Sequence, residues 1–293
     1  MAAAVLNVPC IIVDPREPHT HTVVFLHGRG DNARHFAASL AGSRDSRGRT
    51  LADALPSFRW VFPQAPDRTL ANAPPGTSWP QWFDVWNVRD FTDREDLQAV
   101  GLREAVPAVH RLLADEAALL AGRWDRIVLA GISMGGATGA HVLFNLDNVL
   151  ATPGVVVQGE RRLAAFLGFS SRCPFAGCDL AGMRSALGLA GDGAAPAPDH
   201  AIRNTPVLLE HCVDDPLVLV QNGRLLRDTL RGFGMGVEWK EYPGGGHWFN
   251  APSGMDDAVF FLIRHVLGGG GNADGAEPSL TEDPAPNAMD FER

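Results

Sequence analysis

Apolar residues along this chain follow two alternating patterns. Short runs rich in apolar and β-branched residues predict strands, and longer segments with apolar residues at three- and four-residue spacing predict helices. The predicted strands are 22–26, 59–62, 126–130, 163–168, 206–211 and 236–242, and the predicted helices are 33–40, 93–120, 134–145, 219–231 and 256–267. This alternation is typical of an α/β fold with a mostly parallel central sheet and helices on both faces.

The start of the helix predicted at 93–120 carries a capping signature. Thr92 precedes the periodic segment, and Glu95 follows at the position of a capping box. We therefore expect the Thr92 side chain to cap this helix.

Two regions depart from the alternation. Residues 172–201 are rich in Gly, Ala and Pro, and predict a long segment that is either a flap over the functional site or a loose excursion. Residues 268–293 begin with a glycine run and hold few apolar anchors, which predicts a disordered tail. The remaining pattern contains no internal linker, so we expect one domain over 1–267.

Composition and charge narrow the classes of function. The chain is 45% hydrophobic and carries a formal net charge of -9, without the basic tract that a nucleic-acid-binding surface needs. The N-terminus lacks the pattern of a secretory signal, and no segment predicts a transmembrane span. Cys10, Cys173, Cys178 and Cys212 lack zinc-site spacing and predict reduced thiols in a cytoplasmic protein; a Cys173–Cys178 pair is the alternative in an oxidising compartment.

The segment 131–136 carries the strongest chemical signal. It reads G-I-S-M-G-G, matches G-x-S-x-G, and lies between a predicted strand and a predicted helix. A sharp strand-to-helix turn exposes the serine, and only small neighbours let the backbone pass so closely. This context predicts that Ser133 is a nucleophile, with the Met134 backbone N–H at the helix N-terminus as a donor to an oxyanion.

A serine nucleophile requires a base and a group that orients the base. His247 lies in a glycine-rich loop after the last predicted strand, and two acids, Asp214 and Asp215, follow the strand before it. Adjacent acids on an extended loop point in different directions, so one orients His247 and the other faces solvent or caps the next helix. We select Asp215 as the catalytic acid.

The loop after the first core strand predicts the second oxyanion donor. This loop reads H-G-R-G-D at 27–31, so Arg29 supplies a backbone N–H. The Arg29 side chain is expected to point outward, with pairing to substrate as the alternative. His27 at the strand end is expected to be structural.

An aromatic segment follows at 79–86. It holds three of the seven tryptophans, and we weigh a wall for an acyl pocket against plain core packing. The candidate substrate-binding residues are Trp79, Trp82, Phe83, Trp86 and Trp248.

At these residues the chain resembles the acyl-protein thioesterase and phospholipase/carboxylesterase family of α/β-hydrolases. The resemblance covers roughly residues 23–267 and rests on F-L-H-G-R-G-D at 25–31, F-P-Q-A-P at 62–66, W-F-D at 82–84, G-I-S-M-G-G at 131–136 and H-C-V-D-D-P-L-V at 211–218, followed by G-G-H at 245–247. It implies the α/β-hydrolase fold and the triad Ser133, Asp215 and His247. Arg29, Met134 and Cys212 depart from the Leu, Gln and Gly usual in the family, which puts substrate preference in doubt.

These observations predict a serine hydrolase that cleaves carboxylic esters or thioesters through an acyl-enzyme, with no metal or cofactor. The expected substrate is an S-acylated protein or a lysophospholipid. The alternatives are a small-molecule carboxylesterase with no protein substrate and, less favoured because the triad is intact, a non-catalytic binding module.

Overall fold

A seven-stranded sheet forms the centre of the computed structural model, which describes residues 6–189 and 200–268. The strand order is β1-β3-β2-β6-β7-β8-β9; β1 pairs antiparallel with β3, and the other pairs are parallel. The strands are β1 (Cys10–Val13), β2 (His21–Leu26), β3 (Phe58–Pro63), β6 (Ile127–Ile132), β7 (Ala165–Phe169), β8 (Val207–Cys212) and β9 (Val237–Tyr242). This arrangement confirms the expected α/β-hydrolase fold.

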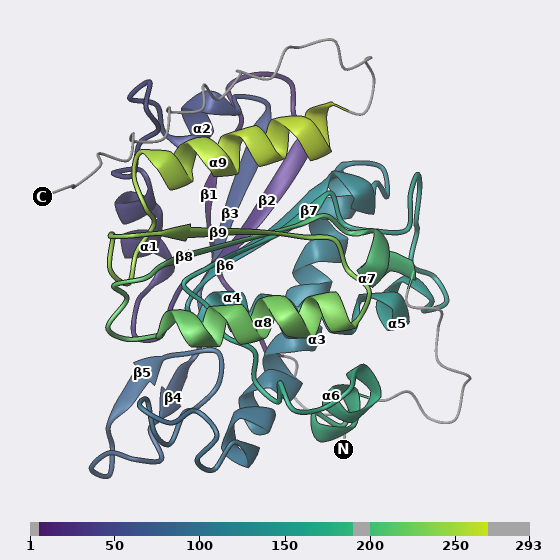
Figure 1. The fold of residues 1–293 in the computed structure, drawn as a ribbon. Coiled ribbons are helices and arrows are strands. Elements are labelled where there is room, and N and C mark those ends of the chain that lie inside the picture. The colour runs from purple at the N-terminus through teal and green to yellow at the C-terminus, as the bar shows by residue number, and fades with distance from the viewer. Residues whose placement is uncertain (1–5, 190–199, 269–293) are drawn as a thin grey trace, which may run out of the picture.

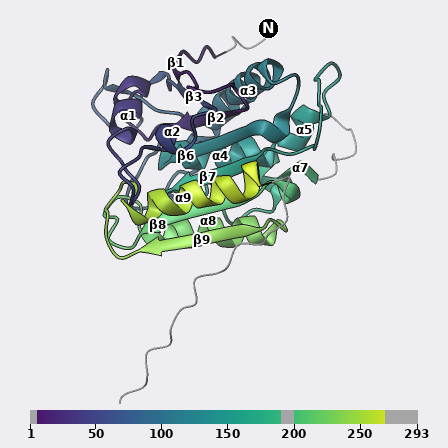
Figure 2. The same ribbon diagram turned by 90° about the horizontal axis from the view of Figure 1, so that it is seen from above.

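Helices cover both faces of the sheet (Figure 1). One face packs against α1 (Ala33–Leu40), α2 (Leu51–Ala54) and α9 (Ser253–Leu262), and the other against α3 (Asp96–Leu119), α4 (Met134–Phe144) and α8 (Val220–Gly232). Figure 2 shows α9 lying across the sheet, with α3 and α4 behind the strands. The layers follow from β2, whose Val24 and Leu26 join one core cluster while Val23 and Phe25 join the other.

The remaining elements are short. They are the hairpin β4 (Asp67–Thr69) and β5 (Ser78–Pro80), α5 (Leu146–Leu150), α6 (Leu180–Ala186), α7 (His200–Asn204), a 3-10 turn at Trp124–Arg126 and a π turn at Ile263–Leu267 that extends α9. The hairpin packs on the loop after β2, because the Gly30 N–H donates to Pro80 O at 2.8 Å. Among the described helices, none is long and apolar enough to cross a membrane.

The predicted strands match the observed strands to within two residues at each end, and the five predicted helices are present. The prediction missed β1, the hairpin, α2, α5, α6 and α7. The reason is length, because three to seven residues give too few repeats to show a period.

The predicted cap at Thr92 is wrong. The Thr92 hydroxyl donates to Asp90 Oδ1 at 2.6 Å, and α3 begins after Glu95 without a side-chain cap. Glu95 instead accepts the Phe175 N–H at 2.6 Å. The Thr92 hydroxyl is therefore bonded to Asp90 in the turn before α3 and does not cap the helix.

The described part of the segment predicted as a flap or loose excursion at 172–201 includes helical turns. It contains α6 and the start of α7, and Met183 and Leu187 are fully buried in the core. Residues 190–199 of this segment lie outside the described residues, as does the predicted tail from 269 onward. All four cysteines are free thiols, with Cys173 buried and Cys178 exposed.

Candidate active site

Ser133 stands at a strained turn between β6 and α4. Its backbone has φ 55 and ψ -121, a conformation that residues other than glycine rarely adopt. Close packing maintains the turn: a Cβ at Gly131 would lie 2.4 Å from Gly135 C, and one at Gly135 would lie 2.2 Å from Leu26 O. The Ser133 N–H donates to Phe169 O at 2.9 Å, which fixes the turn to the neighbouring strand. The predicted strand-to-helix context is therefore present.

Asp215 and His247 form a hydrogen-bonded pair. His247 Nδ1 lies 2.8 Å from Asp215 Oδ2, and because a carboxylate only accepts, Nδ1 carries the hydrogen and Nε2 is left as the acceptor. The Leu217 and Val218 N–H groups both donate to Asp215 Oδ1 at 2.9 Å. These bonds hold the carboxylate in one orientation.

The environment of Asp215 favours its charged form. Burial acts to raise the pKa of Asp215, but hydrogen bonds from His211, His247 and the Val218 N–H outweigh burial and hold this pKa well below its usual range. A permanent carboxylate can stabilise the positive imidazole that forms when His247 takes a proton.

Asp214 faces solvent, which is one of the two expected alternatives, and it also holds a loop. It is exposed but neither idle nor a helix cap, since it accepts the Gly246 N–H at 2.9 Å and the Gly245 N–H at 3.3 Å. Both glycines have positive φ, in the turn that precedes His247. Asp214 thus fixes the loop that carries the imidazole, while Asp215 holds the imidazole itself.

Removal of the Asp214 carboxylate should loosen the His247 loop without changing the imidazole tautomer. We expect Asp214→Ala to lower kcat/KM for an ester by on the order of tenfold, the effect of about 1.4 kcal/mol of lost positioning. Asp214→Asn, which keeps one acceptor oxygen, should retain more activity than Asp214→Ala. Steady-state rates of the two variants check this, and equal rates for both would show that the carboxylate oxygens do not position the loop.

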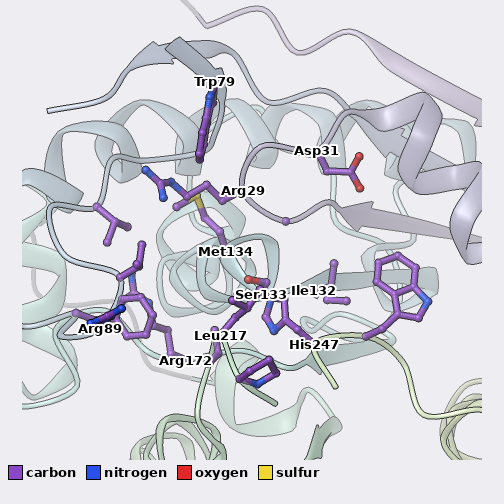
Figure 3. A pocket seen from close by; sticks show the side chains of 17 residues that line it. Arg29, Asp31, Trp79, Arg89, Ile132, Ser133, Met134, Arg172, Leu217 and His247 are labelled. Atoms are coloured by element: carbon purple, nitrogen blue, oxygen red, sulfur yellow. The ribbon is translucent and has the colours of Figure 1, made fainter. Parts of the chain in front are cut away.

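Ser133 and His247 line one pocket of about 680 Å³. Figure 3 shows the His247 ring beside the Ser133 hydroxyl, with the Met134 side chain extending toward Arg29. A Cβ at Gly28 would lie 3.5 Å from Ser133 Cβ, so the loop after β2 passes directly over the serine. The structure therefore gathers residues from three distant segments at one pocket.

The backbone N–H groups of Arg29 and Met134 are the candidate oxyanion donors. In the part of the chain that the structure describes, neither N–H has a hydrogen-bond acceptor. Met134 is the first residue of α4, where the helix dipole also favours negative charge. Both residues line the pocket beside Ser133.

His27 has the structural role that was expected. Its Nδ1 donates to Gly28 O at 2.7 Å, and its Nε2 accepts the Ala65 N–H at 3.0 Å. Burial is the main cause that lowers the pKa of His27, so the ring is neutral and fully bonded. It fixes the loop of Arg29 and is not available as a base.

The side chain of Arg29 does not point outward. Its Nε donates to Gln81 Oε1 at 2.8 Å, its guanidinium lies 5.0 Å from the centre of the Trp79 ring, and it lines the pocket. The expected outward orientation is therefore wrong, and pairing of the Arg29 side chain with substrate stays a prediction.

Of the five candidate substrate-binding residues, Trp79 and Trp248 line the pocket, and Trp82, Phe83 and Trp86 do not. Trp82 and Phe83 are completely buried, and the Trp82 Nε1–H donates to His27 O at 2.9 Å. Trp82 and Phe83 therefore belong to the core. Phe83 packs closely on α3, where a Cβ at Gly101 would lie 2.4 Å from Phe83 Cα.

Other residues complete the pocket wall. The apolar side chains that the sequence did not predict are Val85, Val88, Phe91, Ile132, Pro216, Leu217 and Val218, and the arginines are Arg89 and Arg172. Arg172 follows the end of β7, and the carboxyl ends of parallel strands are where ligands collect in such sheets. That position in the sequence could have identified Arg172 as a candidate.

No group of three or more His, Cys, Asp or Glu side chains able to hold a metal occurs within residues 6–189 and 200–268.

Comparisons of the sequence and of the structure with known proteins agree with one another. The family model described as Phospholipase/Carboxylesterase matches residues 8–175. The chain is 28% identical to an acyl-protein thioesterase 1 of Gibberella zeae over 254 residues, which is 85% of this chain and 92% of that protein. It is 30% identical over 236 residues to a probable inactive carboxylesterase of Oryza sativa subsp. japonica, covering 79% of this chain and 80% of the relative. The crystal structure of Zea mays acyl-protein thioesterase 2 superposes with a TM-score of 0.65 at 25% identity, covering 88% of this chain and 99% of that one.

Proposed function

Since the chain belongs to the phospholipase/carboxylesterase family of α/β-hydrolases, we propose that it cleaves carboxylic esters or thioesters with Ser133 as the nucleophile. The observation that carries the proposal is the 2.8 Å bond from His247 Nδ1 to Asp215 Oδ2, with the imidazole and the strained Ser133 lining the same pocket. One relative is described as a probable inactive carboxylesterase, so membership of the family alone does not establish activity. The proposal therefore rests on the geometry of this chain's own residues.

The proposed reaction has two halves. Ser133 Oγ attacks the acyl carbonyl as His247 Nε2 takes its proton, and the N–H groups of Arg29 and Met134 bind the oxyanion. The same imidazole then gives its proton to the departing alcohol or thiol, which leaves an acyl group on Ser133. Water, deprotonated by His247, attacks this ester, and the proton returns to Ser133 as the carboxylic acid departs.

A covalent probe tests the nucleophile directly. A fluorophosphonate should abolish turnover of 4-nitrophenyl acetate and add one phosphonyl group per chain, the probe mass less HF, on the peptide that contains Ser133. Absence of turnover for every ester tried, or an adduct on another residue, would contradict the proposal.

The acyl substrate is tested by a chain-length series. Because much of the pocket wall is apolar, we expect kcat/KM for 4-nitrophenyl esters to rise about fourfold per methylene until the acyl chain fills the pocket. Parallel oxygen and sulfur esters separate esterase from thioesterase preference. A flat profile from acetyl to palmitoyl would favour a small-molecule carboxylesterase. The S-acylated protein or lysophospholipid substrate and the cytoplasmic location remain predictions.

A further inference from the structure

The active-site pocket is cationic although the protein is acidic. Arg29, Arg89 and Arg172 line the pocket, and the lining contains a single carboxylate, that of Asp31, which pairs with His35 at 2.7 Å. The chain as a whole carries a net charge of -9. A cleft lined by charges of one sign concentrates the field there, so this pocket attracts an anion that the rest of the protein repels.

Arg172 is the most informative of the three arginines. It is 6% exposed, its Nη2 donates to Gln98 Oε1 at 2.7 Å, and its guanidinium lies 4.0 Å from the centre of the Phe91 ring. It forms no ion pair within the described ranges. Burial lowers the pKa of Arg172 to about 10, opposed by the charge of Glu95, so the group stays positive at neutral pH. A charge this buried is costly without an anion at its open N–H groups.

Arg29 is held in the same manner. Its Nε donates to Gln81 Oε1, its guanidinium lies over the Trp79 ring, and the Gln81 amide in turn donates to Asp84 Oδ1 at 3.2 Å. Both arginines are thus oriented by an amide side chain and an aromatic ring. Neither partner neutralises the charge, which leaves the donors open to an anionic ligand.

The positions of the arginines relative to Ser133 decide which part of a substrate meets them. Figure 3 shows Arg89 and Arg172 on one side of Ser133 and His247 on the other. The leaving group must lie beside His247, which protonates it, so the acyl group extends toward the arginines. On the basis of the proposed esterase function, we propose that the acyl group of the substrate carries a terminal carboxylate bound by Arg172. The preferred substrates are then half-esters or half-thioesters of dicarboxylic acids.

A purely structural role for Arg172 makes a different prediction. In that case the contacts with Gln98 and Phe91 only tie the end of β7 to the start of α3, and substitution changes stability without changing the choice of acyl group. A ratio of two rates measured on one preparation separates these roles, because the fraction of folded enzyme cancels in it.

The test compares mono-4-nitrophenyl adipate with its neutral methyl ester, which has the same leaving group and nearly the same length. After subtraction of uncatalysed hydrolysis, kcat/KM should be about 10- to 100-fold higher for the half-ester. Arg172→Gln should bring this ratio close to one, and Arg172→Lys should retain part of it. The matched control Arg47→Gln, at an exposed arginine outside the pocket, should leave the ratio unchanged.

A second pair places the charge on the leaving group: 3-carboxyphenyl and 3-carbamoylphenyl pentanoate should differ little. A preference confined to this pair would overturn the acyl assignment, as would a parent ratio near one or an unchanged ratio in Arg172→Gln. If neutral esters are cleaved without any charge preference, this inference fails alone. If no ester is cleaved, the proposed function fails as well.

Discussion

Ser133→Ala should lower kcat/KM for 4-nitrophenyl esters by about 10,000-fold or more, because the variant has no atom that can form the acyl-enzyme. The oxyanion donors and the pocket remain, so a small residual rate above water is expected. The substitution removes one oxygen from a half-buried side chain and keeps the backbone hydrogen bond from the residue 133 N–H to Phe169 O. Initial rates and fluorophosphonate labelling of the purified variant, with its thermal melting midpoint, check this expectation.

The matched control is Ser185→Ala, at an exposed serine of α6 that does not line the pocket. It should show the parent rate and parent labelling. If Ser133→Ala retained both turnover and labelling, another residue would be the nucleophile and the mechanism would have to be rebuilt around it.

The fold was readable from the sequence because the sheet is buried on both faces. β2 and β6 are apolar at every position except Thr22 and His21 of β2, and parallel strands of this kind produce continuous apolar runs. The flanking helices are long enough to show their period. β1 left no such signal, because it is a four-residue edge strand with Ile12 and Val13 exposed.

The nucleophile was readable for a steric reason. The backbone at Ser133 requires small neighbours, so Gly131 and Gly135 record the turn in the sequence itself. Asp215 and His247 had a weaker signal, since chain order and strand ends place them near the serine without fixing a contact. The assignment of Asp215 over Asp214 agrees with the geometry, but the loop-holding bonds of Asp214 depend on the fold of a glycine turn that no spacing rule encodes.

Substrate-binding residues were the least predictable part of the site. An aromatic-rich segment serves a core and a pocket equally well, and the close approach of α3 at Gly101 is what buries Phe83. Arg172 is the opposite case, because a charged residue in a segment expected to be loose is in fact buried against Gln98 and Phe91. The burial of the aromatic Phe83 and of the charged Arg172 is decided in both cases by contacts between segments far apart in the chain.

Asp215→Asn should lower kcat/KM by about 10,000-fold while leaving the fold intact, because it shifts the hydrogen of the neutral His247 ring from Nδ1 to Nε2. The Leu217 and Val218 N–H groups hold one oxygen at position 215, so the asparagine amide must turn its NH2 toward His247 Nδ1. Nδ1 then has to accept, the hydrogen moves to Nε2, and the ring can no longer take the proton of Ser133. Asp214→Asn, the matched control one residue away, changes no group that touches the imidazole and should stay within about tenfold of the parent. The rates of the two variants, measured beside their melting curves, test this assignment. A larger loss for Asp214→Asn would show that Asp214, and not Asp215, orients the imidazole.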